Sequence, residues 1–312
     1  MSRENRILDP KMENEFMSGT LKPLLEVVRR DRDLILEFRD PFGAAIYCKG
    51  QSLEIKSCRD GDRTIYSTIS ADKKFLTDGF LKLRSAEDAE TFVSKELPFV
   101  KQRMAEHRSS GMEIEFEQAL IRANNLEKNL NTDYFAVDRQ ALLALGQDRI
   151  DVIGICWPDH SSNEDVSLAL IEVKFSLYGG IETLAQQVEG YYNALAKNIV
   201  PQPDGTCEIE GGIAAHTQKL LQQKIRMGLI TGASKEALAK LERLNVSHDA
   251  KQVKIVVAMV DYNLRSPRLT AQIPKLRLLE SAKQLKNPIE VMHLGYGLWA
   301  GNAVTDDLAL VS

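Results

Sequence analysis

Hydrophobic residues recur with two different periods along the chain, and the change of period separates the predicted elements. From about residue 33 to residue 70, short apolar or alternating runs are separated by turn-forming segments such as DPFG and RDGD, which predicts strands. A helical pattern precedes them at about 17–30. The N-terminal part is therefore predicted to form a small antiparallel sheet.

The rest of the chain mixes helical and strand patterns. Helices are predicted at 86–108, 111–125, 181–198, 214–226, 234–243 and 272–286. Strands are predicted at 134–137, 149–155, 168–175, 253–260 and 289–299. A helix, three neighbouring strands, a second helix and a later apolar strand indicate the α/β class, with a mixed sheet flanked by helices. We expect a β-rich module over 1–85 and an α/β domain over 86–312.

Composition narrows the class of protein. The chain has 312 residues, of which 44% are hydrophobic and 27% charged, and a formal net charge of −4. No apolar run approaches the ~18 residues of a membrane span, and the first residues lack the apolar core of a signal peptide. Four scattered cysteines predict reduced thiols. We expect a cytoplasmic protein without a membrane partner.

The segment LALIEVKFSLYGG, residues 168–180, places charge inside an apolar strand. Glu172 and Lys174 follow an unbroken apolar run, and burying such a pair costs several kcal/mol per ion unless other groups compensate. Side chains alternate along a strand, so Glu172 and Lys174 point to the same face.

A third charged residue, Asp151, lies within the preceding predicted strand, RIDVIGI. If the two strands pair, Asp151 can lie beside Glu172, and two neighbouring carboxylates repel each other unless a cation lies between them. Oxygen ligands of this kind suit Mg²⁺ or Mn²⁺, which lowers the pKa of a bound water. Lys174 could then position the water or neutralise developing charge. The alternative is that these three charged residues form an ion-pair cluster with a structural role only.

A similar pattern occurs earlier in the chain and serves as a comparison. Asp40 is followed by Glu54 and Lys56, and the latter two again lie in a predicted strand. Asp40, however, falls in the turn DPFG, and no helix follows Lys56. We therefore favour the set formed by Asp151, Glu172 and Lys174.

Two predicted helices carry further candidate residues. Gln187 and Tyr191 are four positions apart, which places them on one helical face, although an ordinary amphipathic helix would look the same. The helix over 111–125 carries Glu113 and Glu117 beside its apolar stripe, where a carboxylate could reach the sheet edge. A solvated surface role is the alternative for Glu117.

The order of these motifs resembles the PD-(D/E)XK nuclease superfamily, and its RecB-like members in particular. The resemblance covers about 111–195 and rests on the helix with Glu, RIDVIGI, IEVKF and the Q-x-x-x-Y helix. It implies a restriction-endonuclease-like fold over 86–312. It assigns Asp151 and Glu172 as metal ligands and Lys174 as the catalytic lysine, and it places Gln187 and Tyr191 at the active site or nucleic acid. Glu117, with Glu113 as the next choice, would be the helix ligand. The proline that names the family is replaced by Ile150.

The resemblance implies a Mg²⁺-dependent (or Mn²⁺-dependent) deoxyribonuclease, in a setting such as restriction, phage defence or repair. A module of the same fold that binds nucleic acid without cutting it, and a ribonuclease, remain alternatives, as does a structural protein. Basic residues within 264–286, together with Lys219, Lys224 and Arg226, could contact phosphates or could be solvated helix faces. The N-terminal hairpins could pair with a second copy of the chain.

Overall fold

The fold is described from a computed structural model. It covers residues 5–60, 63–107, 112–127, 132–141, 143, 149–175, 180–201, 209, 211–263 and 266–294. The chain divides into two compact units, which are Met1–Thr132 with Lys219–Arg243, and Asp133–Gln218 with Leu244–Ser312. The predicted boundary at residue 85 does not coincide with this division, because the helices from residue 86 to residue 126 belong to the first unit. The assignment of 86–312 to one nuclease domain stays a prediction.

The first unit contains a five-stranded antiparallel sheet. Its strands, in spatial order, are β1 (Ile35–Asp40), β2 (Gly43–Cys48), β3 (Gln51–Asp60), β4 (Arg63–Ser70) and β5 (Phe80–Leu83). The β2–β3 turn consists of Lys49 and Gly50, which both have positive φ as a tight two-residue hairpin requires. The predicted N-terminal antiparallel sheet is confirmed. Its fifth strand, β5, was not predicted, because its four residues are too short a run to show a period.

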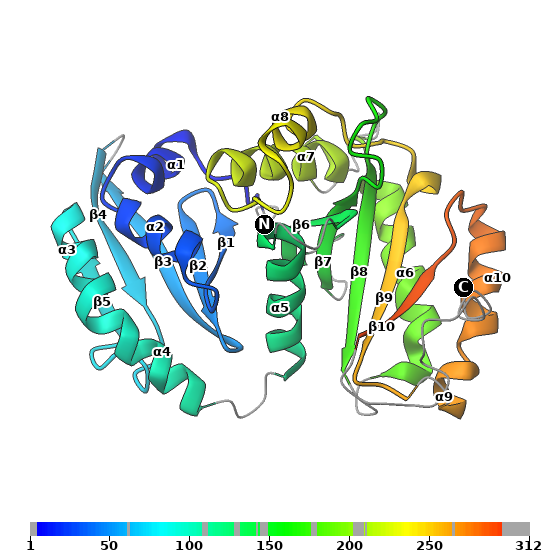
Figure 1. The fold of residues 1–312 in the computed structure, drawn as a ribbon, viewed down its shortest axis with the longest axis horizontal. Coiled ribbons are helices and arrows are strands. Elements are labelled where there is room, and N and C mark those ends of the chain that lie inside the picture. Colours follow the sequence, from blue (N-terminus) through cyan, green and yellow to red (C-terminus); the bar gives the residue numbers. More distant parts are fainter. Residues whose placement is uncertain are drawn as a thin grey trace. The chain divides into compact units, whose positions relative to one another are not determined.

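Helices lie against this sheet (Figure 1). They are α1 (Pro10–Met17), α2 (Lys22–Arg30), α3 (Ala86–Thr91), the π-helical turn η1 (Phe92–Glu96) and α4 (Leu97–Glu106). The unit also holds α5 (Met112–Leu126), the end of α7 (Gly212–Arg226) and α8 (Lys235–Leu241). The helix predicted at 17–30 corresponds to α2, which ends at Arg30 as expected but begins later, at Lys22, and the preceding helix α1, which ends at Met17, was not predicted. Ser18 caps α1, and Pro23 occupies the first turn of α2, where its missing N–H costs nothing.

The second unit contains a five-stranded mixed sheet. Its strands are β6 (Tyr134–Ala141), β7 (Ile150–Cys156), β8 (Ser167–Phe175), β9 (Lys254–Val260) and β10 (Glu290–Leu294), in the spatial order β10-β9-β8-β7-β6. β7 runs antiparallel to both β6 and β8, whereas β8, β9 and β10 run parallel to one another. The predicted α/β class with a mixed sheet is confirmed, and residues 295–299 of the last predicted strand lie outside the described residues.

The central strand of this sheet is β8, which has a neighbour on each side. Seven of its nine residues are buried, which is why its apolar residues form a continuous run instead of alternating with polar ones. At Gly154 on β7, an added Cβ would lie 2.5 Å from the carbonyl oxygen of Phe135, so the close approach of β6 requires glycine.

The second unit's helices are α6 (Leu184–Asn198), α9 (Pro267–Thr270), α10 (Ile273–Lys283), the start of α7, and the 3₁₀ turns η4 (Ile181–Thr183) and η5 (Ala250–Gln252). In Figure 1, α6 and α10 lie next to each other beside β9 and β10. The Nζ atom of Lys283 on α10 bonds Asn193 Oδ1 on α6 at 2.9 Å. Among the described residues, none of the helices has the length and apolar character that crossing a membrane requires.

Candidate active site

Asp151 and Glu172 lie on neighbouring strands of the second unit. Val152 of β7 pairs with Ile171 of β8 in the antiparallel register, so the next pair along the ladder brings Asp151 opposite Glu172. The backbone N–H of Val173 donates to Asp151 Oδ2 at 2.8 Å. A backbone donor of β8 therefore holds the carboxylate of β7 at this point of the sheet.

Glu172 and Lys174 share one face of β8, as the strand alternation predicts. Lys174 Nζ donates to Glu172 Oε1 at 2.5 Å. Glu172 is 2% exposed and Lys174 is 8% exposed, so this ion pair lies away from water. The attraction within such a buried ion pair offsets the cost of desolvation only when the remaining polar atoms of the two side chains are also hydrogen-bonded.

Within the described part of the chain, one oxygen of Glu172 has no such partner. The atom is Oε2, which is buried and has no hydrogen bond of standard geometry, although the Tyr191 hydroxyl lies near this carboxylate. Burial, together with the nearby charge of Asp151, raises the pKa of Glu172 to about 8, although the Lys174 ammonium and the nearby Tyr191 hydroxyl lower it. The fold thus holds a carboxylate whose charged form is poorly satisfied by the protein alone.

Asp151 is held by two donors from the strands on either side. Besides Val173, the side-chain Nε2 of Gln140 on β6 donates to Asp151 Oδ1 at 3.0 Å. Burial raises the pKa of Asp151, whereas these two hydrogen bonds and the charge of Lys174 lower it. Gln140 was missed in the sequence, because no pattern there shows which residue of β6 faces Asp151.

The predicted Gln187 and Tyr191 meet on α6. Gln187 Nε2 donates to the Tyr191 hydroxyl at 2.8 Å, and this hydroxyl donates to the carbonyl oxygen of Arg149 at 3.3 Å, immediately before β7. Burial raises the pKa of Tyr191, and the nearby charge of Glu172 raises it further. The structure therefore brings the Q-x-x-x-Y pair to the same place as the two carboxylates.

The glutamates of α5 belong to the first unit, whereas Asp151 and Glu172 belong to the second. Glu117 is 1% exposed and is not the solvated surface carboxylate that we considered as its alternative role. Its assignment as a third metal ligand, with Glu113 as the next choice, stays a prediction.

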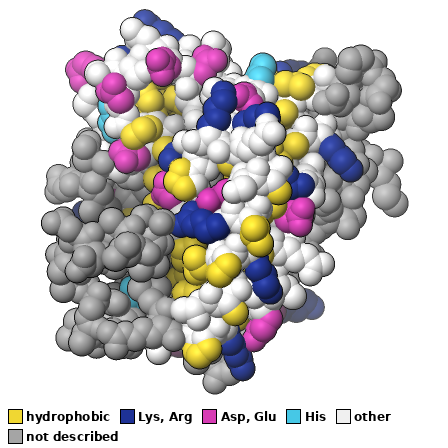
Figure 2. Space-filling view, turned by 90° about the vertical axis from the view of Figure 1, so that its right-hand side faces the viewer, with side chains coloured by type: hydrophobic (Ala, Val, Ile, Leu, Met, Phe, Trp, Pro, Cys, Tyr) yellow, Lys and Arg dark blue, Asp and Glu magenta, His cyan; other side chains and the backbone are white. Residues whose placement is uncertain are grey.

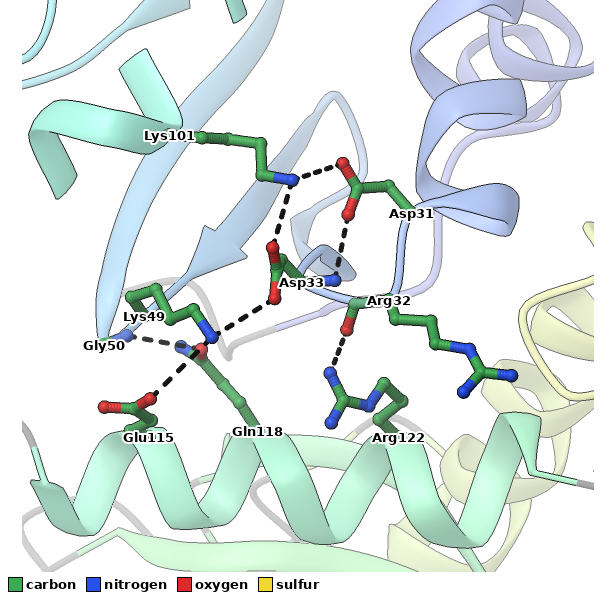
Figure 3. Close-up of polar contacts among 9 residues, drawn as sticks. All are labelled: Asp31, Arg32, Asp33, Lys49, Gly50, Lys101, Glu115, Gln118 and Arg122. Atoms are coloured by element: carbon green, nitrogen blue, oxygen red, sulfur yellow. Dashed lines mark hydrogen bonds and ion pairs between the residues drawn. The ribbon is translucent and has the colours of Figure 1, made fainter. Parts of the chain in front are cut away.

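Within the first unit, the N-terminal turns of α5 contact the hairpin between β2 and β3 (Figure 3). Glu115 lies 4.0 Å from Lys49 Nζ, and the N–H of Gly50 donates to Gln118 Oε1 at 3.3 Å. Lys49 also pairs with Asp33 at 3.1 Å. These contacts fix the helix that carries the candidate glutamates against its own sheet.

The earlier Asp-Glu-Lys pattern differs from the later one in its surroundings. Glu54 and Lys56 are exposed on β3, and Asp40 Oδ1 accepts the N–H of Phe42 within a turn. Charges in water carry no desolvation cost, so this pattern needs no cation to explain it. This difference in burial supports the sequence-based preference for the set of Asp151, Glu172 and Lys174 over the earlier pattern.

The donor set of the second unit is compatible with a hard divalent cation. It offers two carboxylates, one of which has a buried oxygen without a hydrogen-bond partner. The described residues contain no cluster of three or more His, Cys, Asp or Glu side chains arranged to hold a metal ion. Mg²⁺ suits a site of one or two carboxylates, because it retains several waters.

Most of the basic side chains proposed for phosphate contact have acidic partners. Lys224 is 2% exposed and bonds both carboxylate oxygens of Glu37, at 3.0 and 2.8 Å, so it forms neither the phosphate contact nor the solvated helix face that were considered for it. The other described pairs are Arg226 with Glu13, Arg268 with Glu182, Arg277 with Glu280, Lys283 with Glu189 and Lys286 with Asp249. Figure 2 views the face where α10 lies, and there basic side chains are interspersed with acidic and hydrophobic ones. Arg265 lies outside the described residues.

Comparison of the chain with protein-family models, with curated proteins and with solved structures finds no match in any of the three.

Proposed function

We propose that the chain is a metal-dependent nuclease that hydrolyses phosphodiester bonds of DNA. The observation that carries this proposal is the buried Glu172, whose Oε2 lacks a partner while Asp151 lies opposite and Lys174 lies beside it. A protein that only needed a stable sheet would gain from an apolar residue at this position.

The order of elements supports the same proposal. A helix with glutamates, α5, precedes three antiparallel strands, β6 to β8, and α6 leads on to β9, which runs parallel to β8. This order and the positions of Asp151, Glu172, Lys174, Gln187 and Tyr191 are those that the resemblance to PD-(D/E)XK nucleases implies.

In this proposal the two carboxylates of Asp151 and Glu172 hold Mg²⁺ or Mn²⁺. The ion, when bound, supplies a more acidic water and stabilises charge on the phosphoryl oxygens. Lys174 places its ammonium beside the carboxylates, where it can donate a hydrogen bond to the attacking water or to a phosphate oxygen. Tyr191 and Gln187 hold the position of α6 against the strand that carries Asp151.

The alternative is a module that binds nucleic acid without cutting it. The observation that favours it is the ion pair between Lys174 and Glu172, which satisfies the ammonium and one carboxylate oxygen within the protein. In that case neither residue would be needed for chemistry, and the two functions predict different results in one experiment.

The experiment incubates the full chain with plasmid DNA, single-stranded DNA and RNA, in Mg²⁺, Mn²⁺ or EDTA. We expect DNA cleavage that EDTA abolishes and that Lys174→Ala and Glu172→Gln each reduce at least ~100-fold. Lys56→Ala and Glu54→Gln are the matched controls, because they change the same residue types in exposed strand positions. Binding without cleavage would support the non-cutting module, and cleavage of RNA alone would replace DNA as the substrate. Cleavage that survives Lys174→Ala would overturn the assignment of the site.

A further inference from the structure

Gln140 is the residue of β6 that faces Asp151. Beyond a β-bulge between Ala136 and Asp138, Arg139 pairs with Val152 and Ala141 pairs with Ile150. Gln140 therefore lies directly opposite Asp151, which in turn lies opposite Glu172. One row across three strands holds an amide and two carboxylates.

The bulge decides which side chain takes this place. Before it, Ala136 pairs with Gly154, and a ladder continued in that register would bring Arg139 opposite Asp151. The extra residue shifts the register by one, so that the neutral amide of Gln140 faces the carboxylate instead of a guanidinium. A neutral amide can orient the Asp151 carboxylate by a hydrogen bond, whereas a guanidinium would also neutralise the negative charge that attracts a metal ion.

The backbone of Gln140 is in a conformation that side-chain-bearing residues seldom adopt. Its φ is +53°, in the left-handed region, although it lies within a strand. Such a conformation is energetically unfavourable and persists where the surroundings impose it, often at functional sites. The cost is unexplained if the residue only completes the sheet, because glycine would adopt the same backbone freely.

We infer that Gln140 is a positioning residue that fixes the Asp151 carboxylate for binding of a divalent cation. Gln140 Nε2 bonds Asp151 Oδ1 at 3.0 Å, while the Val173 N–H bonds Oδ2 at 2.8 Å, so both oxygens are held by donors. Each oxygen keeps a further lone pair for a ligand. Partners of this kind contribute about 10- to 100-fold to metal affinity. The inference rests on the proposed function, because it needs a metal site at Asp151.

Gln140→Gly separates this role from a structural one. It relieves the left-handed backbone strain, so we expect the metal-free melting temperature to hold or to rise by about 2 °C. It also removes the donor to Asp151, so we expect Mn²⁺ to bind about 10-fold or more weakly. Gln140→Met, which keeps the side-chain length and the strain but has no amide, should weaken Mn²⁺ to the same degree.

Gln284 provides a matched control in the same unit. It also has a φ of +53°, at the C-terminal cap of α10, and its Oε1 accepts a hydrogen bond from Lys251. Gln284→Gly relieves the same strain, and we expect it to leave Mn²⁺ affinity unchanged.

The measurement is calorimetric titration of the metal-free full chain with Mn²⁺, together with thermal melts of the same samples in EDTA. Weakened Mn²⁺ binding in both Gln140 variants, without a loss of stability in Gln140→Gly, supports the inference. Unchanged Mn²⁺ affinity in both variants overturns it and leaves the proposed function standing. Absence of Mn²⁺ binding by the unmodified chain overturns both.

Discussion

The ammonium of Lys174 lies 2.5 Å from one oxygen of Glu172, two residues earlier on the same strand, while the other oxygen of Glu172 is buried without a hydrogen-bond partner in the described structure. The ammonium thus compensates only half of the carboxylate. Without a ligand, the raised proton affinity of Glu172 compensates for the other oxygen, and under the proposed function a bound metal ion would replace that proton.

The first prediction concerns the pH dependence of stability without metal. The pKa of Glu172 is raised from 4.5 to about 8 in the folded protein, so the folded state binds this proton more tightly than the unfolded chain. The protonated Glu172 therefore stabilises the folded state fully at pH values below the unfolded pKa of 4.5. This stabilisation is lost as the pH rises towards 8, at a rate of at most about 1.4 kcal/mol per pH unit. Thermal melts in EDTA between these pH values should show a falling melting temperature.

Glu172→Gln should flatten that pH dependence, because an amide does not titrate. Glu54→Gln is the control, since Glu54 is exposed on β3. If the unmodified chain and Glu172→Gln lost stability with the same slope, another group would be responsible.

The second prediction compares the two carboxylates in EDTA at pH 8. Glu172→Gln keeps an Oε1 acceptor for Lys174 and places its amide nitrogen where Oε2 has no partner, so relief of repulsion should raise the melting temperature. Asp151→Asn must turn its amide nitrogen towards either the Val173 N–H or the Gln140 amide, because both oxygens accept donors. The donor left unpaired in Asp151→Asn costs about 1–3 kcal/mol of the free energy of unfolding. This variant should therefore be stabilised less than Glu172→Gln, or be destabilised.

Chemical denaturation of both variants measures this difference. A larger gain in the free energy of unfolding for Asp151→Asn than for Glu172→Gln would contradict the hydrogen-bond arrangement around Asp151.

The third prediction concerns the buried pair of Glu37 and Lys224 in the first unit. These residues are 1% and 2% exposed. Glu37→Ala or Lys224→Ala alone should cost about 3–5 kcal/mol of the free energy of unfolding, because each leaves an unpaired buried charge. The double change to Met at both positions should recover most of that loss.

A more exposed ion pair on the same helix serves as the control. Arg226 lies two residues after Lys224 on α7 and bonds Glu13, and 45% of the arginine side chain is exposed. Arg226→Ala should cost about 1 kcal/mol or less. Denaturant titration distinguishes the two cases, and equal costs would show that Lys224 is not desolvated.

The fourth prediction is that Gln187 and Tyr191 act as a unit. Tyr191→Phe removes the hydroxyl that accepts from Gln187 and donates to the Arg149 carbonyl, and Gln187→Leu removes the first of these bonds. In a double-mutant cycle, their effects on the free energy of unfolding should couple by about 0.5 kcal/mol or more. Strictly additive effects would indicate that the two side chains do not touch in solution.

The elements that carry the site could be read from the sequence because local patterns specify them. The apolar run of β8 and the charged residues within it predicted a buried strand with Glu172 and Lys174 on one face, since alternation of side chains is a local property. The position of Asp151 within an apolar strand was visible for the same reason. The α/β class followed from the order of these periods.

Tertiary structure alone decided the partners of those residues. Gln140 faces Asp151 only because a bulge shifts the β6 register by one residue, and register depends on strand pairing. The helical pattern around Lys224 predicted a surface position, but the side chain is buried against Glu37, a residue 187 positions away. The sequence by itself determined which residues lie on strands and helices and which face they share, because those periods are local. Which charges are desolvated and which atom is left without a partner depends on contacts between distant segments, which form only when the chain folds.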